Sequence, residues 1–191
     1  MALRDLIRLV PPPDQPFDSV GNWHAAEFLI ESEFPPDFKE LIGNYGSGNF
    51  FHRHLTVFNP LTIEGLAGIK EVSDIHRGHF VHGWTLQLSV HPNRGGPGIL
   101  FWGRDKHGRG YGWLTLGKPE RWPVVYVGHD AGELPVLFRM TVTKFLAGFA
   151  VNEFPEPIME GDGIAEHTRV FTPMERKAPP APDRIRKKRK G

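Results

Sequence analysis

The apolar positions between residues 36 and 45 recur every three or four residues, which is the spacing of one helix face. They are Phe38, Leu41, Ile42 and Tyr45. Pro35 and Pro36 stand at the start, where proline is tolerated because the N–H it lacks would be unpaired anyway. Asp37 adds a carboxylate near the positive end of the helix dipole. We therefore predict a helix closed by Gly46 in the left-handed conformation.

A second helix is predicted just before the first one. Residues 21–31 are largely apolar, and Asp18 or Ser19 is a suitable N-cap for them. The Pro-Pro pair then forces a turn into the next helix. We expect the two helices to form a short hairpin that leaves its apolar faces for a sheet.

The remaining chain alternates between strand and helix patterns. Residues 63–77 have helical apolar spacing, and Thr141 is a plausible N-cap for a helix with an apolar face over residues 142–150. Short apolar or alternating runs bounded by turn residues predict strands. These runs are residues 54–58, 84–90, 99–103, 111–116 and 122–127, with a possible edge strand at 167–171. The last three of the five form a sequential antiparallel meander.

These patterns define an α+β fold: a central, mostly antiparallel sheet with an N-terminal helical hairpin and a C-terminal helix packed on it. The chain has 191 residues, of which 39% are hydrophobic, enough for one substantial core. It lacks cysteine and has no apolar run of about 18 residues, so disulfides, thiolate zinc sites and a membrane span are not expected. The N-terminus also lacks the apolar core of a secretory signal, so a cytoplasmic location is the simplest expectation.

Several motifs, taken in order, resemble those of the SUKH superfamily over roughly residues 20–153. They are Phe34-Pro35-Pro36-Asp37-Phe38-Lys39-Glu40-Leu41, Tyr45-Gly46-Ser47-Gly48, Phe101-Trp102-Gly103-Arg104-Asp105, Gly110-Tyr111-Gly112-Trp113, Trp122-Pro123-Val124-Val125 and the helix around Phe145-Leu146. That superfamily includes fungal cell-wall assembly regulators of the Smi/Knr type and many bacterial immunity proteins. The resemblance implies an α+β fold that binds the catalytic domain of a toxin and blocks its active site. It implies no catalytic residue and no cofactor.

The resemblance also suggests a division of the chain. Residues 1–16 are an N-terminal extension and Pro-rich linker, and residues 17–154 are the SUKH-like domain. Residues 155–174 form a C-terminal extension, and residues 175–191 are a disordered basic tail.

Candidate partner-binding residues lie in and around the meander. Side chains alternate between the two faces of a strand, so one face of the sheet is expected to expose aromatic residues that anchor a partner. In the alternative, terminal extensions cover that face. Nearby acidic side chains supply a rim for a basic partner. The predicted contact residues are Trp102, Asp105, Trp113, Glu120, Asp130 and Glu133.

The charge of the chain is unevenly distributed. Residues 175–191 hold eight Lys/Arg and two Asp/Glu, a net of +6, whereas residues 1–174 hold 15 Lys/Arg and 20 Asp/Glu, a net of −5. An acidic body favours a basic partner and repels nucleic acid. The tail has the composition of a polyanion-binding segment, although a solvated end is the alternative. Its candidate residues are Arg184, Arg186, Lys187, Lys188, Arg189 and Lys190.

Ten histidines raise the alternative of a metal-dependent hydrolase. His76, His79 and His82 are spaced three apart near Asp74, and His52 and His54 form a second pair. No H-E-x-x-H pattern accompanies them, and neighbouring arginines disfavour a dication, so no metal site is predicted. The favoured interpretation is a non-enzymatic protein-binding module, most simply an immunity protein. A regulatory scaffold that binds another cellular protein is the alternative.

Overall fold

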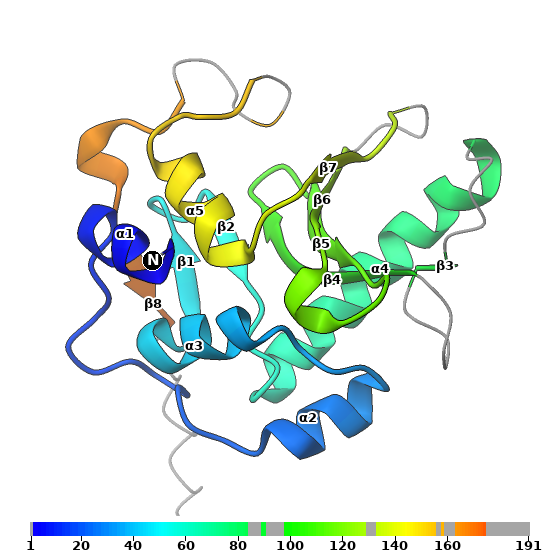
Figure 1. The fold of residues 1–191 in the computed structure, drawn as a ribbon, viewed down its shortest axis with the longest axis horizontal. Coiled ribbons are helices and arrows are strands. Elements are labelled where there is room, and N and C mark those ends of the chain that lie inside the picture. The colour runs from blue at the N-terminus through cyan, green and yellow to red at the C-terminus, as the bar shows by residue number, and fades with distance from the viewer. Residues whose placement is uncertain are drawn as a thin grey trace, which may run out of the picture.

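A computed structural model describes residues 2–83, 89–90, 98–128, 133–155, 158 and 163–174, with the side chains of residues 78–83 and 89–90 left aside. Within these ranges it contains helices and a mainly antiparallel sheet, so the predicted α+β class is confirmed. Figure 1 shows the order of the elements along the chain. No helix in these ranges has the length and apolar character needed to cross a bilayer.

The helices differ widely in length. The α-helices are α1 (Ala2–Leu9), α2 (Trp23–Ile30), α3 (Pro36–Tyr45), α4 (Ile63–Gly83) and α5 (Val142–Ala150). Two 3-10 turns are η1 (Pro119–Arg121) and η2 (Glu166–Thr168). The predicted helices at 36–45 and 142–150 are confirmed, and Thr141 caps α5 by accepting a hydrogen bond from the backbone N–H of Lys144.

The strands form one sheet in the order β7-β6-β5-β4-β2-β1-β8, and β3 pairs with β4 in parallel. All other pairs are antiparallel, which includes the predicted meander β4–β5–β6. The strands are β1 (Gly48–Phe50), β2 (Leu55–Val57), β3 (Ser89–Val90), β4 (Gly98–Asp105), β5 (Gly110–Leu114), β6 (Val124–Val127), β7 (Val136–Phe138) and β8 (Phe171–Pro173).

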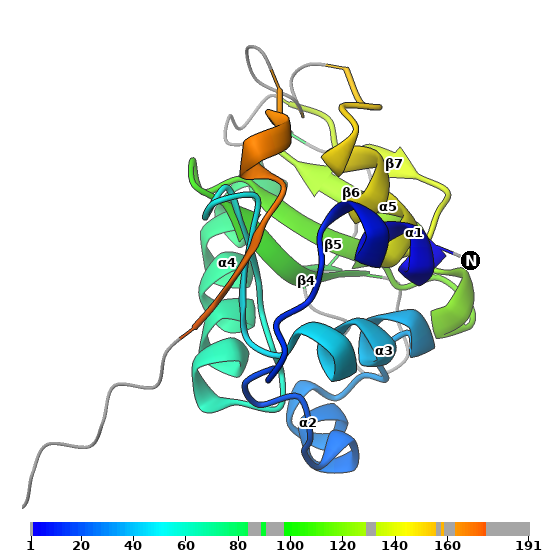
Figure 2. The ribbon, with the colours of Figure 1, turned by 90° about the vertical axis from the view of Figure 1, so that its left-hand side faces the viewer.

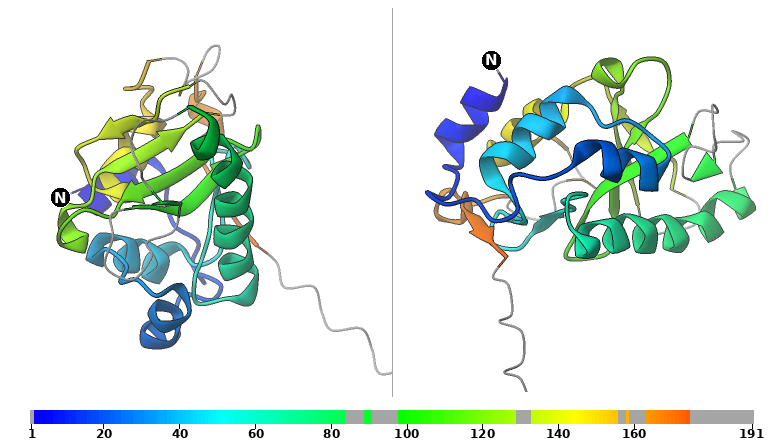
Figure 3. Two further views of the ribbon diagram at one scale, coloured as in Figure 1. Left: turned by 90° about the vertical axis from the view of Figure 1, so that its right-hand side faces the viewer. Right: turned by 90° about the horizontal axis from the view of Figure 1, so that it is seen from below.

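Helices lie on both faces of the sheet. α1, α3 and α5 form a layer on one side of the strands, and α4 runs along the other side (Figures 2 and 3). Phe145 of α5 lies 6.2 Å from Trp102 of β4 on the first side, and His76 of α4 stacks on Phe101 at 5.1 Å on the second. Both faces of the middle strands are therefore buried.

α2 and α3 contact each other through Trp23 and Phe38, but α2 begins and packs differently from the prediction. Asn22, not Asp18 or Ser19, is its N-cap and accepts a hydrogen bond from the backbone N–H of Ala25 over 3.1 Å. Trp23 packs edge-on against Phe34 at 5.8 Å. Phe28 and Leu29 remain exposed instead of facing the sheet.

Gly46 ends α3 with a positive φ of 68°, but its ψ of −148° lies outside the left-handed helical region. A Cβ at this position would lie 1.9 Å from the carbonyl oxygen of Phe17. The backbone of residue 17 crosses the end of α3 and accepts a hydrogen bond from the N–H of Ser47. Glycine is therefore required by this close approach as well as by its dihedral angles.

The N-terminal segment is part of the packed domain. Leu6 of α1 and Val10 just after it are fully buried, and the hydroxyl of Tyr45 donates a hydrogen bond to the carbonyl of Val10 over 2.6 Å. The sequence pattern predicts neither α1 nor the short strands β1 and β7. The core therefore extends beyond the predicted boundary at residue 17.

The predicted C-terminal edge strand forms, but at residues further along the chain than predicted. The edge strand β8 pairs with β1, but it covers residues 171–173, and residues 166–168 form η2. Of the predicted strand at 84–90, the structure describes only β3. Asp130, the tail from residue 175 onward and its six basic candidates lie outside the described residues.

Candidate functional site

Trp102 and Trp113, predicted to anchor a partner, lie in the core. They are 0% and 1% exposed. The Nε1–H of Trp102 donates to the carbonyl of Gly112 over 3.0 Å, and Trp113 packs edge-on against Phe38 of α3 at 4.9 Å. Their assignment as surface residues is wrong, because the helical layer covers the sheet face to which they point.

Asp105 is also a structural residue, not part of an acidic rim. Its carboxylate forms an ion pair with the Arg109 guanidinium, and the two side chains are 0% and 6% exposed. The same carboxylate accepts hydrogen bonds from the backbone N–H groups of His107 and Arg109 at 2.9 and 3.0 Å. These bonds close the β4–β5 hairpin, so this prediction fails because the carboxylate is used within the turn.

The buried ion pair is surrounded by two tyrosines from the meander. The Arg109 guanidinium lies over the ring of Tyr126 at 5.8 Å, and the Tyr111 hydroxyl lies 3.4 Å from the Asp105 carboxylate. Burial raises the pKa of the Tyr111 hydroxyl, and the negative charge of Asp105 raises it further. Both effects favour a neutral tyrosine beside the carboxylate.

The two remaining described candidates lie in different places. Glu133 is half-buried, and its carboxylate folds over the backbone of Gly128 so closely that a Cβ there would lie 1.4 Å from Oε2. Glu120 is exposed on η1, between β5 and β6. The structure therefore does not gather the described acidic candidates, Asp105, Glu120 and Glu133, into one surface.

The histidines do not form a metal site within the described part of the chain. His76 is fully buried, and His52 and His54 lie in the turn between β1 and β2 instead of a strand. No group of three His, Asp or Glu side chains with a suitable arrangement occurs among the described residues. The side chains of His79 and His82 lie outside that description.

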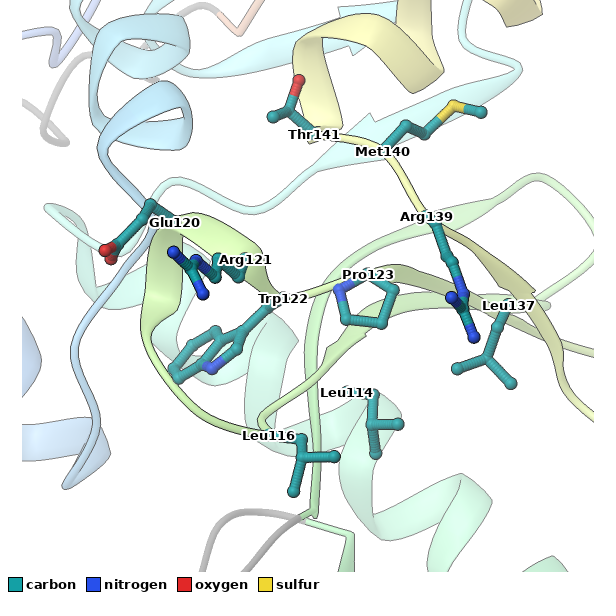
Figure 4. Close-up of a pocket in the computed structure, with 10 residues that line it drawn as sticks. All are labelled: Leu114, Leu116, Glu120, Arg121, Trp122, Pro123, Leu137, Arg139, Met140 and Thr141. Atoms are coloured by element: carbon teal, nitrogen blue, oxygen red, sulfur yellow. The ribbon is translucent and has the colours of Figure 1, made fainter.

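An open groove lies at the end of the meander, between η1 and the segment that follows β7 (Figure 4). Its volume is about 580 Å³. The groove is lined mainly by apolar side chains, with polar groups on its walls. The lining residues are Leu114, Leu116, Glu120, Arg121, Trp122, Pro123, Leu137, Arg139, Met140 and Thr141.

Two exposed leucines contribute to the apolar lining of the groove. Leu116 is 63% exposed and Leu137 is 51% exposed. The exposure of Leu137 follows from strand alternation. Its neighbour Phe138 points to the other face of the sheet and contacts Phe145 of α5 at 5.2 Å. Leu137 therefore lies on the sheet face opposite α5, where none of the described helices covers it fully.

Arginines stand on both sides of this apolar surface. Arg121 comes from η1 and Arg139 from the segment after β7, with Pro123 between them in Figure 4. Both are exposed, and within the described ranges neither forms an ion pair. Sequence reasoning found only Glu120 of this site. The two arginines are 18 positions apart and follow no local motif.

A second apolar surface lies on and before α2, which protrudes from the body in Figures 1 and 2. Val20, Phe28 and Leu29 are 91%, 76% and 65% exposed. None of these three residues lines the groove. This surface is a useful point of comparison for the groove.

Compared with protein-family models, curated proteins and solved structures, the chain matches none of them.

Proposed function

We propose that this chain is a non-enzymatic protein-binding domain and that the groove at the end of the meander is its contact surface. The exposed pair Leu116 and Leu137, between two arginines that form no ion pair with any described residue, carries this proposal. Exposed apolar side chains with a polar rim are characteristic of protein interaction sites. Arginine is also enriched where interfaces hold most of their binding energy.

A protein partner fits this surface better than a small ligand. Small-molecule sites bury about 70–90% of their ligand. The two leucines of the groove are more than half exposed, so the groove is an open surface and not the enclosed cleft that is typical of small-molecule sites. A larger partner would cover both leucines and the arginines together.

The more specific proposal is that the domain is an immunity protein, which binds a toxin and blocks its active site. This rests on the SUKH-like order of motifs from the Pro-Pro-Asp entry of α3 to the helix around Phe145. Inhibition by occlusion requires a preformed surface and no reactive group. A regulatory scaffold of the same class uses the same surface without inhibiting its partner.

The experiment is capture of a partner from the source cells with the immobilised full chain, in wild-type form and as the L116E/L137E variant. The matched variant is F28E/L29E, which places the same charges on the exposed apolar surface of α2. Circular dichroism checks that all three proteins are folded. We expect a partner retained by the wild type and F28E/L29E but lost from L116E/L137E.

If only F28E/L29E loses the partner, the binding surface lies on α2 and the assignment to the groove is overturned. The activity of a partner found in this way distinguishes an immunity protein from a regulatory scaffold. Activity of the captured protein that falls to zero at a one-to-one ratio supports the immunity function. Full activity at saturation supports the scaffold.

A further inference from the structure

β7 ends the sheet on the side of the groove. Within the described residues it pairs only with β6, through Val124–Phe138, Val125–Leu137 and Tyr126–Val136. The other side of an edge strand offers backbone N–H and C=O groups to another extended chain. Addition of a partner strand to such an edge is a common mode of peptide recognition.

The side chains beside this edge determine which residue types fit in an added strand. Leu137 and Arg139 are two positions apart and both line the groove. Alternate residues of an added strand would lie next to them on the same face. An apolar residue fits beside Leu137, and an acidic residue fits beside Arg139.

The charge of the groove points in the same direction. Arg121 and Arg139 have no ion-pair partner within the described ranges, and Glu120 is the single acidic residue of the lining. A guanidinium binds a carboxylate through two parallel hydrogen bonds. The groove therefore has a local positive character within a body whose first 174 residues carry a net charge of −5.

We propose that the groove and the edge of β7 bind an extended segment of a partner protein in which an apolar residue and an acidic residue stand two positions apart, so that both face the groove. Beside β7 the added strand places an apolar side chain next to Leu137 and a carboxylate next to Arg139, and the continuing chain crosses the groove to reach Leu116 and Arg121. This inference rests on the proposed protein-binding function and names the chemistry of the partner. It replaces the basic partner that the acidic candidates predicted.

The probe is a random library of 12-residue peptides displayed on phage and selected on the immobilised full chain. We expect enriched peptides in which Asp or Glu lies two positions from an apolar residue. A synthetic enriched peptide, followed by fluorescence polarisation, should lose affinity by about tenfold or more for the R121E/R139E variant, because charge attraction becomes repulsion. The R4E/R53E variant has the same change in net charge at two exposed arginines outside the groove and should stay within about twofold.

A second measurement tests the strand geometry. Two versions of the peptide carry N-methyl groups on alternate residues, in opposite registers. In a strand, only alternate N–H groups point toward the neighbouring strand. We expect one version to lose binding and the other to keep it.

Three outcomes would overturn the inference. Enriched peptides are basic, uncharged or absent; acidic peptides bind R121E/R139E as well as the wild type; or both N-methylated versions bind equally. The protein-binding function is judged separately by capture on L116E/L137E. If that variant loses a partner while the peptide result is negative, the groove binds a protein of different chemistry.

Discussion

The carboxylate of Asp37, in the first turn of α3, accepts a hydrogen bond from the backbone N–H of Thr143, in the first turn of α5, over 3.3 Å. The two residues are 106 positions apart, yet one carboxylate lies at the N-termini of two helices. It satisfies an N–H that α5 itself leaves unpaired and lies at the positive ends of both helix dipoles. Asp37 therefore joins the predicted N-terminal helix to the C-terminal one.

We expect Asp37→Ala to lower the free energy of unfolding by about 1 kcal/mol or somewhat more, as for loss of a helix cap. Asp37→Asn keeps an acceptor oxygen and should cost less. Urea unfolding measures both, and Asp5→Ala, on the exposed face of α1, is the control. Equal losses for Asp37→Ala and Asp5→Ala would show that the contact with α5 has no energetic role.

The Asp37 carboxylate also makes the stability of the folded protein depend on pH. Burial raises the pKa of Asp37 above 3.8, although the hydrogen bonds from Thr143 oppose this shift. The folded state then binds the proton more tightly than the unfolded chain. The stabilisation that the Asp37 carboxyl group provides is therefore present below pH 3.8 and is lost as the pH rises through the pKa of Asp37 in the folded state. The stability of the wild type relative to Asp37→Asn should fall over that interval, whereas a constant difference would contradict the shift.

The second prediction concerns the buried ion pair of the β4–β5 hairpin. Arg109→Met leaves the Asp105 carboxylate buried without its cation, and such losses cost about 3–5 kcal/mol. The double variant D105N/R109M removes the charge and should recover a substantial part of that stability. Urea unfolding of the single and double variants measures the difference.

The matched control is Arg104→Met, whose pair with Glu71 is partly exposed at 38% and 56%. Loss of an exposed pair costs about 0–1 kcal/mol. If Arg109→Met were as mild as Arg104→Met, the ion pair would have no role in holding the hairpin.

The third prediction concerns His54, whose ring lies 5.7 Å from that of Phe149. Burial lowers the pKa of His54 below 6.5, and the positive charge of Lys106 lowers it further. Below 6.5 the unfolded chain takes up a proton more readily than the folded state, so stability falls as pH drops from 6.5 through the folded pKa. His54→Leu should flatten this slope in unfolding curves, and His24→Leu, at an exposed site, should not. Parallel slopes for wild type and His54→Leu would refute the prediction.

The fourth prediction tests the N-terminal helix. Leu6 is fully buried, and removal of a buried leucine side chain costs about 2–5 kcal/mol. Leu6→Ala should therefore lower the midpoint of urea unfolding strongly, whereas Arg4→Ala, at an exposed position of the same helix, should change stability by about 0.5 kcal/mol at most. Similar midpoints for the two variants would place α1 outside the cooperative unit.

Local signals were sufficient for some elements of the fold. The proline entry and apolar stripe specify α3, and Thr141 with its apolar face specifies α5. The turn residues between β4, β5 and β6 specify the meander. In each case the signal lies within about ten residues, where capping and side-chain periodicity act.

Other elements depend on contacts between distant residues. α1 is short and its own sequence mixes charge with apolar positions; its place follows from burial of Leu6 and from the bond between Tyr45 and Val10. Burial of Trp102 and Trp113 likewise depends on which sheet face receives α3 and α5. Strand alternation shows that the sheet has two faces, but not that helices cover both of them over the middle strands.

The sequence by itself determined the α+β class, the helices α3 and α5 and the order of the central strands. Only the tertiary structure decided which candidate residues are buried and which arginines flank the groove. Arg121 and Arg139 both line the groove because η1 and the end of β7 lie at the same end of the sheet. That proximity comes from strand pairing across the chain, which no local pattern of residues encodes.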